Sequence, residues 1–434
     1  MSYGIKTTSD TSAKIKSSFL GVGIPQDLTR KNFLSLYGAA FFGTMLTVFP
    51  AIIQPLFLKE IIGIPDSRAG SLNSLMQNMS QIASLLLGGY VGYLSDRVGR
   101  RILLLWGFIS TGIICIAFAY SKEIGLEIGI PPEISALIIR FFLGVALIFT
   151  WPHFTTLTTD YTYKESRGKA MAIYGFMVGL ATIFTSGLIG QLPKKIGIYE
   201  TFYVIAFFTL IGWLVAKLGV VDRFSEDKKK EGKLKEALAI VRESTPLKVS
   251  YVATLMSRAD TPIFRLIFFV WAVTEAKKFG YTPAQATGIG GIVLMGLAAT
   301  ALLSNIALGP MVDRMGRVTT LMISMSCCTA GLIIIYFFKN PFTYWVAVPV
   351  ALIGFGMSGA VIGANTLAAD SAPKHMVGTV IGGLTTIQSI GILVFLQTSG
   401  FIRDAVSNQS AFLFKAGINI VALVWIFSVR KKCR

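Results

Sequence analysis

A chain of 434 residues in which 53% are hydrophobic and only 14% are charged has too little polar material to cover a water-soluble globule, for which about 25% charge is typical. The formal net charge of +18 would suit a nucleic-acid-binding protein, but the basic residues stand in short clusters between long apolar runs. That pattern is typical of the loops that orient a membrane protein. We therefore expect no nucleic acid as a partner and assign the apolar surface to lipid.

The chain is expected to be an all-α membrane protein with twelve transmembrane helices. Residues 1–32 are polar and lack the apolar core and cleavage site of a signal peptide, so the first span should act as its own insertion signal. A transmembrane helix needs about 20 mainly apolar residues. Segments that satisfy this requirement lie approximately at 33–58, 69–95, 102–121, 133–157, 168–191, 199–221, 250–275, 285–311, 318–338, 342–368, 376–400 and 410–429.

The polar segments predict how the chain is divided and oriented. The expected order is a cytoplasmic segment at 1–32, an N-terminal six-helix bundle at 33–221, a cytoplasmic linker at 222–249, a C-terminal six-helix bundle at 250–429 and a cytoplasmic tail at 430–434. Basic residues concentrate in the loops on the side of both termini, and fewer, Arg403 and Lys415 among them, are assigned to the other side. Because basic loops stay inside, both termini are expected in the cytoplasm and the protein in the cytoplasmic membrane.

An internal repeat relates the two predicted bundles. The loop motif at residues 92–100 recurs at 309–317, which places Asp96 and Asp313 at a spacing of 217. Asp160 and Asp370 repeat at a spacing of 210, in the same order along the chain. A nearly constant spacing indicates a duplicated six-helix unit. Because each unit has an even number of spans, the two repeats should be parallel, related by an axis along the membrane normal.

At this repeated loop the sequence resembles the major facilitator superfamily, and the resemblance covers the whole chain. The family's G-x-x-x-D-R-x-G-R-R pattern is complete at 92–101 and lacks only its last basic residue in the second copy, and residues 140–144 are similar to the family's R-x-x-x-G motif. The resemblance implies a secondary active transporter in which two bundles alternate access to a midplane site. Residues 185–190 replace the Gly-Pro part of a motif common in the family's antiporters, which weighs against drug efflux.

The repeated loop predicts a gate on the cytoplasmic side. Its residues are Gly92, Asp96, Arg97, Gly99, Arg100, Arg101, Asp160 and Arg167 in the first half, and Gly309, Asp313, Arg314, Gly316, Arg317 and Asp370 in the second. Glycine allows a tight reversal between spans, and an aspartate can face the positive end of a helix. We expect Asp96 near Gly378 and Asp313 near Gly168, as latches that break when the cytoplasmic side opens. Alternatively, the charges only orient the chain.

Charged residues well inside the spans are candidates for function, because each costs at least about 2.5–3.5 kcal/mol at mid-membrane. They are Arg140, Arg258, Asp260 and Arg265. Pro262 should break the seventh span near Arg258, and broken backbone at membrane depth is tolerated where it lines a wet cavity. We therefore expect this stretch to face the central pathway.

The chemistry of these residues suggests proton coupling. Asp260 is the predicted proton site, with Arg258 or Arg265 as its partner in one state and as the partner of an anionic substrate in another. A permanent structural ion pair is the alternative. Arg140 should have an acidic partner elsewhere, an anionic substrate or a purely structural role.

Neutral polar residues in the spans are candidates for the same pathway. Asn73, Gln77 and Gln81 recur every four residues and share one face of the second span. Single polar residues in other spans are Gln54, His153, Asn365 and Gln388. All of them could instead make hydrogen bonds between helices, and His153 could be a packing residue.

The sequence predicts a transporter and no enzyme. It contains no G-x-S-x-G, H-E-x-x-H or P-loop motif and only two histidines, so we expect neither a metal nor a cofactor. Three buried arginines against one aspartate favour a small organic anion, such as a carboxylate, as substrate and protons as the coupling ion. A drug or metabolite efflux antiporter and a non-transporting membrane sensor of the same fold are the alternatives. We expect a monomer in the lipid bilayer.

Overall fold

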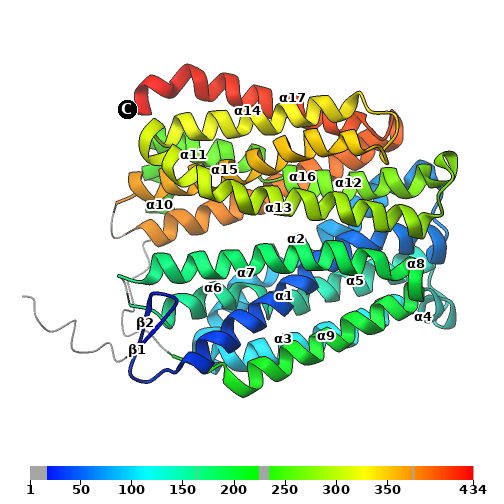
Figure 1. Ribbon diagram of the computed structural model, residues 1–434, viewed down its shortest axis with the longest axis horizontal. Coiled ribbons are helices and arrows are strands. Elements are labelled where there is room, and N and C mark those ends of the chain that lie inside the picture. Colours follow the sequence, from blue (N-terminus) through cyan, green and yellow to red (C-terminus); the bar gives the residue numbers. More distant parts are fainter. Residues whose placement is uncertain (1–16, 164, 224–233, 374–375, 434) are drawn as a thin grey trace, which may run out of the picture.

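The computed structural model describes residues 17–163, 165–223, 234–373 and 376–433 (Figure 1). Parts of the predicted N-terminal segment, linker and tail, namely 1–16, 224–233 and 434, lie outside the described residues. The first half contains β1 (Ser17–Phe19), β2 (Val22–Ile24), α1 (Arg30–Phe57), α2 (Ala69–Val98), α3 (Arg100–Ala119), α4 (Ser121–Glu127), α5 (Pro132–Ile148), α6 (Trp151–Asp160), α7 (Arg167–Leu188), α8 (Leu192–Ile196) and α9 (Ile198–Gly219). The second half contains α10 (Leu234–Glu243), α11 (Thr245–Ser257), α12 (Asp260–Glu275), α13 (Pro283–Met315), α14 (Arg317–Tyr336), α15 (Ala347–Ser371), α16 (Val377–Ala405) and α17 (Ser410–Val429).

The helices are long and apolar enough to cross a membrane, as predicted. In the described part of the chain, ten helical stretches meet this criterion by length and composition. Two further segments complete the expected set of twelve: α2, which has 30 residues, and the interrupted pair α11 and α12. The structure is therefore consistent with twelve spans.

Two of the spans are broken near a proline. The span that contains α11 and α12 is interrupted at Arg258 and Ala259. Pro262 has no N–H group to donate to the carbonyl of Arg258, four residues earlier. The span that contains α5 and α6 is interrupted at Phe149 and Thr150, just before Pro152. Proline lacks the N–H group and clashes with the preceding turn, which gives a physical reason for both interruptions. Proline does not break every span, because α1 continues through Pro50 and α13 through Pro310.

The helices form two layers that correspond to the two halves of the sequence (Figure 1). Helices α1–α9 make up one layer around a large apolar core, and α11–α17 make up the other around two main cores, one of which also includes Val48, Ile52 and Ala69 of the first half. The layers meet chiefly along two helix pairs, α2 with α16 and α7 with α13. These pairs occupy matching positions in the repeat, as expected for a duplicated unit.

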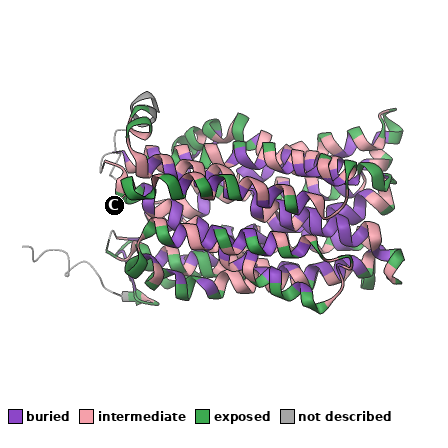
Figure 2. Ribbon diagram, turned by 90° about the horizontal axis from the view of Figure 1, so that it is seen from above, coloured by how far each residue is buried: buried purple, intermediate pink, exposed green. Residues whose placement is uncertain are grey.

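Apolar side chains also cover the outside of the molecule. Leu86, Phe207 and Val421 are among the large apolar residues whose exposed fractions exceed one half. Figure 2 shows buried residues along the middle of the helices and exposed residues around the periphery and at the ends. An apolar exterior around a packed interior is what a lipid environment requires.

A short hairpin precedes the first span and was not predicted. Strands β1 and β2 pair in antiparallel register around Leu20 and Gly21, both of which have positive φ. Two-residue hairpin turns favour such a conformation. Val22 and Ile24 are buried in the core that includes α1, so the hairpin covers one end of the first bundle.

Candidate functional site

The two halves enclose a central cavity of about 450 Å³. Its walls come from α1, α2, α5 and α6 of the first half and from α11, α12, α15 and α16 of the second. Six residues predicted for the pathway line it: Gln77, Gln81, Arg140, Arg258, Arg265 and Gln388. None of the described residues that line it is Asp or Glu, so its charged walls are entirely cationic.

Arg140 is held by neutral acceptors only. Its Nε donates to Gln54 Oε1 at 3.3 Å, Nη1 to Ser80 Oγ at 2.7 Å and Nη2 to Gln77 Oε1 at 3.2 Å. Gln54 in turn donates to the backbone oxygen and Oδ1 of Asn73, at 2.9 and 3.1 Å. This network fixes the guanidinium at the cavity wall and leaves its charge without an acidic partner among the described residues.

Arg258 and Arg265 face Arg140 from the second half, beside the break between α11 and α12. Arg258 Nη2 donates to Asn365 Oδ1 at 3.0 Å, another neutral acceptor. The Nε atoms of Arg258 and Arg265 are buried, and neither has a hydrogen-bond partner in the described part of the chain. Buried donors without partners are costly. Both side chains also line the cavity, so their guanidinium groups border the space that a ligand would occupy.

The structure corrects the predicted partner of Asp260. This side chain is absent from the described cavity lining. It forms an ion pair with Lys415 of α17, with 2.6 Å between Oδ1 and Nζ, and not with Arg258 or Arg265. Both side chains are fully buried, at 1% and 0% exposure. Ser257, Arg258 and Thr261 line the cavity, so the helix break presents an arginine to the cavity and turns the aspartate into the second bundle.

Further contacts hold this buried ion pair. Asn419 Nδ2 donates to both Asp260 oxygens, at 3.0 and 3.2 Å, and Cys328 Sγ lies 3.4 Å from Oδ2. Lys415 Nζ also donates to Met256 O at 2.7 Å and to Asn419 Oδ1 at 2.5 Å. The sequence prediction missed Lys415 by assigning it to an outer loop. Its place five residues inside the twelfth predicted span was the signal that could have identified it.

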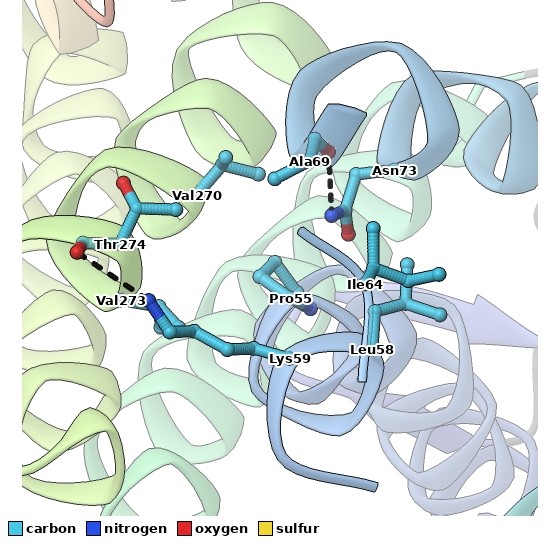
Figure 3. Close-up of a pocket in the computed structure, with 9 residues that line it drawn as sticks. All are labelled: Pro55, Leu58, Lys59, Ile64, Ala69, Asn73, Val270, Val273 and Thr274. Carbon is cyan, nitrogen blue, oxygen red and sulfur yellow. Dashed lines mark hydrogen bonds between the residues drawn. The ribbon is translucent and has the colours of Figure 1, made fainter. Parts of the chain in front are cut away.

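The remaining polar candidates lie outside the described lining of the central cavity. Asn365 positions Arg258, and Gln54 positions Arg140. Asn73 donates to Ala69 O at 2.7 Å and borders a void of about 10 Å³ (Figure 3). His153 is buried in α6, and its Nε2 has no hydrogen-bond partner among the described residues.

The two halves are closed against each other at the end away from the repeated loops, which we call the distal end. Asp404 at the end of α16 accepts hydrogen bonds from the backbone N–H groups of Gly70 and Ser71 at the start of α2, both at 2.7 Å. On the other side, Gln191 donates to Gly288 O at 2.6 Å. The void in Figure 3, where α1 and α2 meet α12, is barely large enough for one water molecule.

The opposite end, which carries the repeated loops and which we call the motif end, shows the same contact twice. Gly99 and Gly316 turn the chain with φ of 102° and 84°. Directly after these turns, Arg100 forms an ion pair with Asp160, and Arg317 forms one with Asp370 at 2.7 Å. Arg100 also lies 3.5 Å from Asp96. In each half, therefore, the repeated loop is tied to the end of the fourth span.

Other basic residues of the first loop hold it to the connection after α9. The backbone N–H of Arg101 donates to Asp222 at 2.8 Å, and its side chain donates to Lys217 O at 2.8 Å. Nearby, the Tyr161 hydroxyl both donates to and accepts from the backbone of Val221. Burial raises the pKa of Tyr161 to about 12, so the hydroxyl keeps the proton that it donates. Arg97 lies over the Tyr93 ring at 4.6 Å.

The expected latches between the halves are not formed in the described part of this structure. The Asp96 side chain is 71% exposed, and its ion-pair partner is Arg100 of the same half. Beyond the chain neighbours and the backbone of the same helix, no described atom lies within 4 Å of the position that a Cβ would take at Gly168 or Gly378. Asp313 and Arg314 border a wide depression that is lined by residues of the second half alone. Among the described residues, the hydrogen bonds that join the halves at the distal end have no counterpart between the two repeated loops at the motif end.

Comparison with known proteins places this architecture in a family. The model of the Major Facilitator Superfamily matches residues 35–396 and 264–433. The magnetosome protein MamH of Paramagnetospirillum magneticum is 26% identical over 88% of this chain and 88% of its own length. The magnetosome protein MamZ of Magnetospirillum gryphiswaldense is 25% identical over 90% of this chain, but the match spans only 61% of that protein. A multidrug-resistance efflux pump homologue of Lactococcus lactis, PmrA, is 18% identical over 92% of this chain and 94% of its own length.

Solved structures share the fold at low sequence identity. The nucleoside transporter NupG has a TM-score of 0.71 and 12% identity, and the alignment covers 93% of this chain and all of that one. A D-xylose-proton symporter has a TM-score of 0.68 and 13% identity over 91% of this chain and 96% of the other. At this identity the likeness concerns the fold alone.

Proposed function

Because this chain belongs to the Major Facilitator Superfamily and is thus a membrane transporter and not an enzyme, we propose that it carries a small organic anion, such as a carboxylate, by proton-coupled alternating access. The cationic cavity carries the first part of the proposal. Arg140, Arg258 and Arg265 converge on it from both halves. Among the described residues, Arg140 and Arg258 have neutral acceptors as partners, and Arg265 Nε has no hydrogen-bond partner.

Charge balance favours an anionic cargo over a cationic one. A carboxylate roughly 4 Å from a guanidinium gains about 4 kcal/mol at an effective dielectric constant of 20, and three such groups would repel a cation by comparable amounts. Arg258 and Arg265 line the cavity, so their guanidinium groups could donate to an anion bound there. A carboxylate oxygen is the acceptor that a guanidinium binds best.

The position of the cavity supports alternating access. With the predicted orientation, the motif end would lie in the cytoplasm, and this conformation would correspond to an inward-facing state in a cytoplasmic membrane. The halves at 33–221 and 250–429 would then rock around the cavity, opening the distal end and closing the motif end. Asp96 and Asp313 would form their latches in that second state.

Proton coupling is assigned to the ion pair of Asp260 and Lys415. The pair adjoins the cavity through the break that also carries Arg258. Protonation of Asp260 would remove its attraction to Lys415 and loosen the junction between α11 and α12. The competing role is a permanent structural ion pair.

Uptake into proteoliposomes tests the anion. Purified protein should take up radiolabelled carboxylates, and Arg265→Gln should lower the uptake at least tenfold because it removes one cavity charge. Arg430→Gln removes an equal charge beside Phe427, outside the described cavity lining, and should leave uptake unchanged. Equal uptake by wild type and Arg265→Gln would contradict the anionic-substrate proposal.

A pH gradient across the same vesicles tests the coupling. The double variant Asp260→Asn/Lys415→Met removes both charges of the pair, so no buried charge is left alone. It should still bind the carboxylate but should no longer respond to the pH gradient. If uptake by this variant responds to the pH gradient as uptake by the wild type does, the ion pair has only a structural role.

A further inference from the structure

A second chamber of about 240 Å³ adjoins the central cavity. It lies between the halves, with α7 on one side and α12, α13 and α15 on the other. Thr261, Arg265, Met357 and Val361 line both spaces. Arg265 therefore stands at the boundary between the cavity and this side chamber.

The two spaces differ in chemistry. The central cavity carries Gln77, Gln81 and Arg140 on the wall formed by the first half. The side chamber is lined mainly by small and aliphatic residues, such as Val178, Leu294, Leu297, Ala301 and Leu302. Burial of hydrocarbon is favourable in such surroundings, at about 0.8 kcal/mol for each methylene group.

We propose that the transported anion is amphipathic: its carboxylate binds Arg265, and an apolar arm lies in the side chamber. This inference rests on the anion transport proposed above and narrows its substrate class. The chamber is smaller than the roughly 300–1,000 Å³ of sites that hold whole drug-sized ligands. It therefore suits an alkyl or aryl arm of a few carbon atoms attached to a head group that remains in the central cavity.

Gly175 offers a way to fill the side chamber. It lines the chamber from α7, and beyond its chain neighbours and the backbone of its own helix no described atom lies within 4 Å of the position that its Cβ would take. A leucine at this position can therefore occupy the chamber without a clash at Cβ. Gly296 of α13 has the same free space but is absent from the described lining of both chambers, which makes Gly296→Leu a matched control.

Binding of a homologous series to protein in nanodiscs, measured by isothermal titration calorimetry, tests the arm. Acetate, butyrate and hexanoate share one head group, and each added methylene should tighten binding roughly fourfold in the wild type. Gly175→Leu should reduce the preference for hexanoate over acetate at least tenfold, and Gly296→Leu should retain it. Hexanamide, which has the arm without the charge, should bind at least tenfold more weakly than hexanoate.

The outcomes distinguish the apolar arm from the proposal of anion transport on which it rests. If acetate and succinate bind through Arg265 but chain length has no effect, the apolar arm is wrong and anion transport stands. A chain-length preference that survives in Gly175→Leu also overturns the arm. If no carboxylate binds the wild type, both proposals fall. If Gly175→Leu does not fold, a wild-type series without any effect of chain length still overturns the arm.

Discussion

The buried pair of Asp260 and Lys415 makes a quantitative prediction about stability. Lys415→Met removes the ammonium 2.6 Å from the carboxylate and leaves Asp260 with Asn419 and Cys328 as neutral partners, at 1% exposure. Breaking a buried ion pair by removing one partner costs about 3–5 kcal/mol, because the remaining charge stays buried without compensation. We expect Lys415→Met to lower the free energy of unfolding by about that amount.

A double-mutant cycle isolates the pair itself. Asp260→Asn alone leaves the Lys415 ammonium with neutral acceptors, namely Met256 O, Asn419 Oδ1 and the new amide oxygen, so its charge stays buried without compensation and the change should cost a similar amount. Asp260→Asn/Lys415→Met leaves no buried charge and should be more stable than the sum of the single changes implies, by about 2 kcal/mol or more.

Urea titration of the unfolding transition in mixed micelles measures all four proteins. Lys195→Met, which changes an exposed lysine in α8, should shift the free energy of unfolding by no more than about 0.5 kcal/mol. If Lys415→Met costs less than about 1 kcal/mol, or if the two single changes add without coupling, the charges do not compensate each other as the geometry implies.

Two further predictions concern the ends of the molecule. Asp404→Ala removes the acceptor that joins the halves at the distal end. Because charged hydrogen bonds contribute about 1.5–3 kcal/mol, an impermeant maleimide should label a Ser74→Cys reporter about tenfold faster in this variant. An unchanged labelling rate would show that this contact does not hold the end shut. At the motif end, Gly99→Ala and Gly316→Ala both force a side chain to positive φ, at about 1–2 kcal/mol. Gly99→Ala should lower the melting temperature more than Gly316→Ala does. The Cβ at position 99 would also meet Asp222 at 2.5 Å, whereas no such neighbour is found at the Gly316 position among the described residues. Equal melting temperatures of the two variants would contradict this reasoning.

Apolar run length and repeated motifs were sufficient to predict the architecture. Each span must bury about 20 residues in hydrocarbon, and such runs are visible without knowledge of their neighbours. The helix break near Pro262 was predictable for the same kind of reason, because proline acts on its own backbone. The positive φ at Gly99 and Gly316 likewise follows a local signal, a glycine between two helices.

The partners of the ionic residues were not predictable in this way. Asp260 and Lys415 are 155 positions apart, and nothing along the chain indicates which face of α12 meets α17. Sequence proximity favoured Arg258 and Arg265, yet the helix break turns these side chains towards the cavity and Asp260 away from it. The contacts of Arg100 with Asp160 and of Arg317 with Asp370 were also missed, although all four residues had been singled out.

The sequence by itself determined that this protein is a duplicated bundle of membrane-spanning helices with a few costly charges inside it. Hydrophobicity and backbone chemistry are local, so they can be read one segment at a time. Only the tertiary structure decided which charges face the shared cavity and which neutralise each other within one bundle. That choice depends on how the helices are rotated against one another, and rotation is set by packing between residues far apart in the chain.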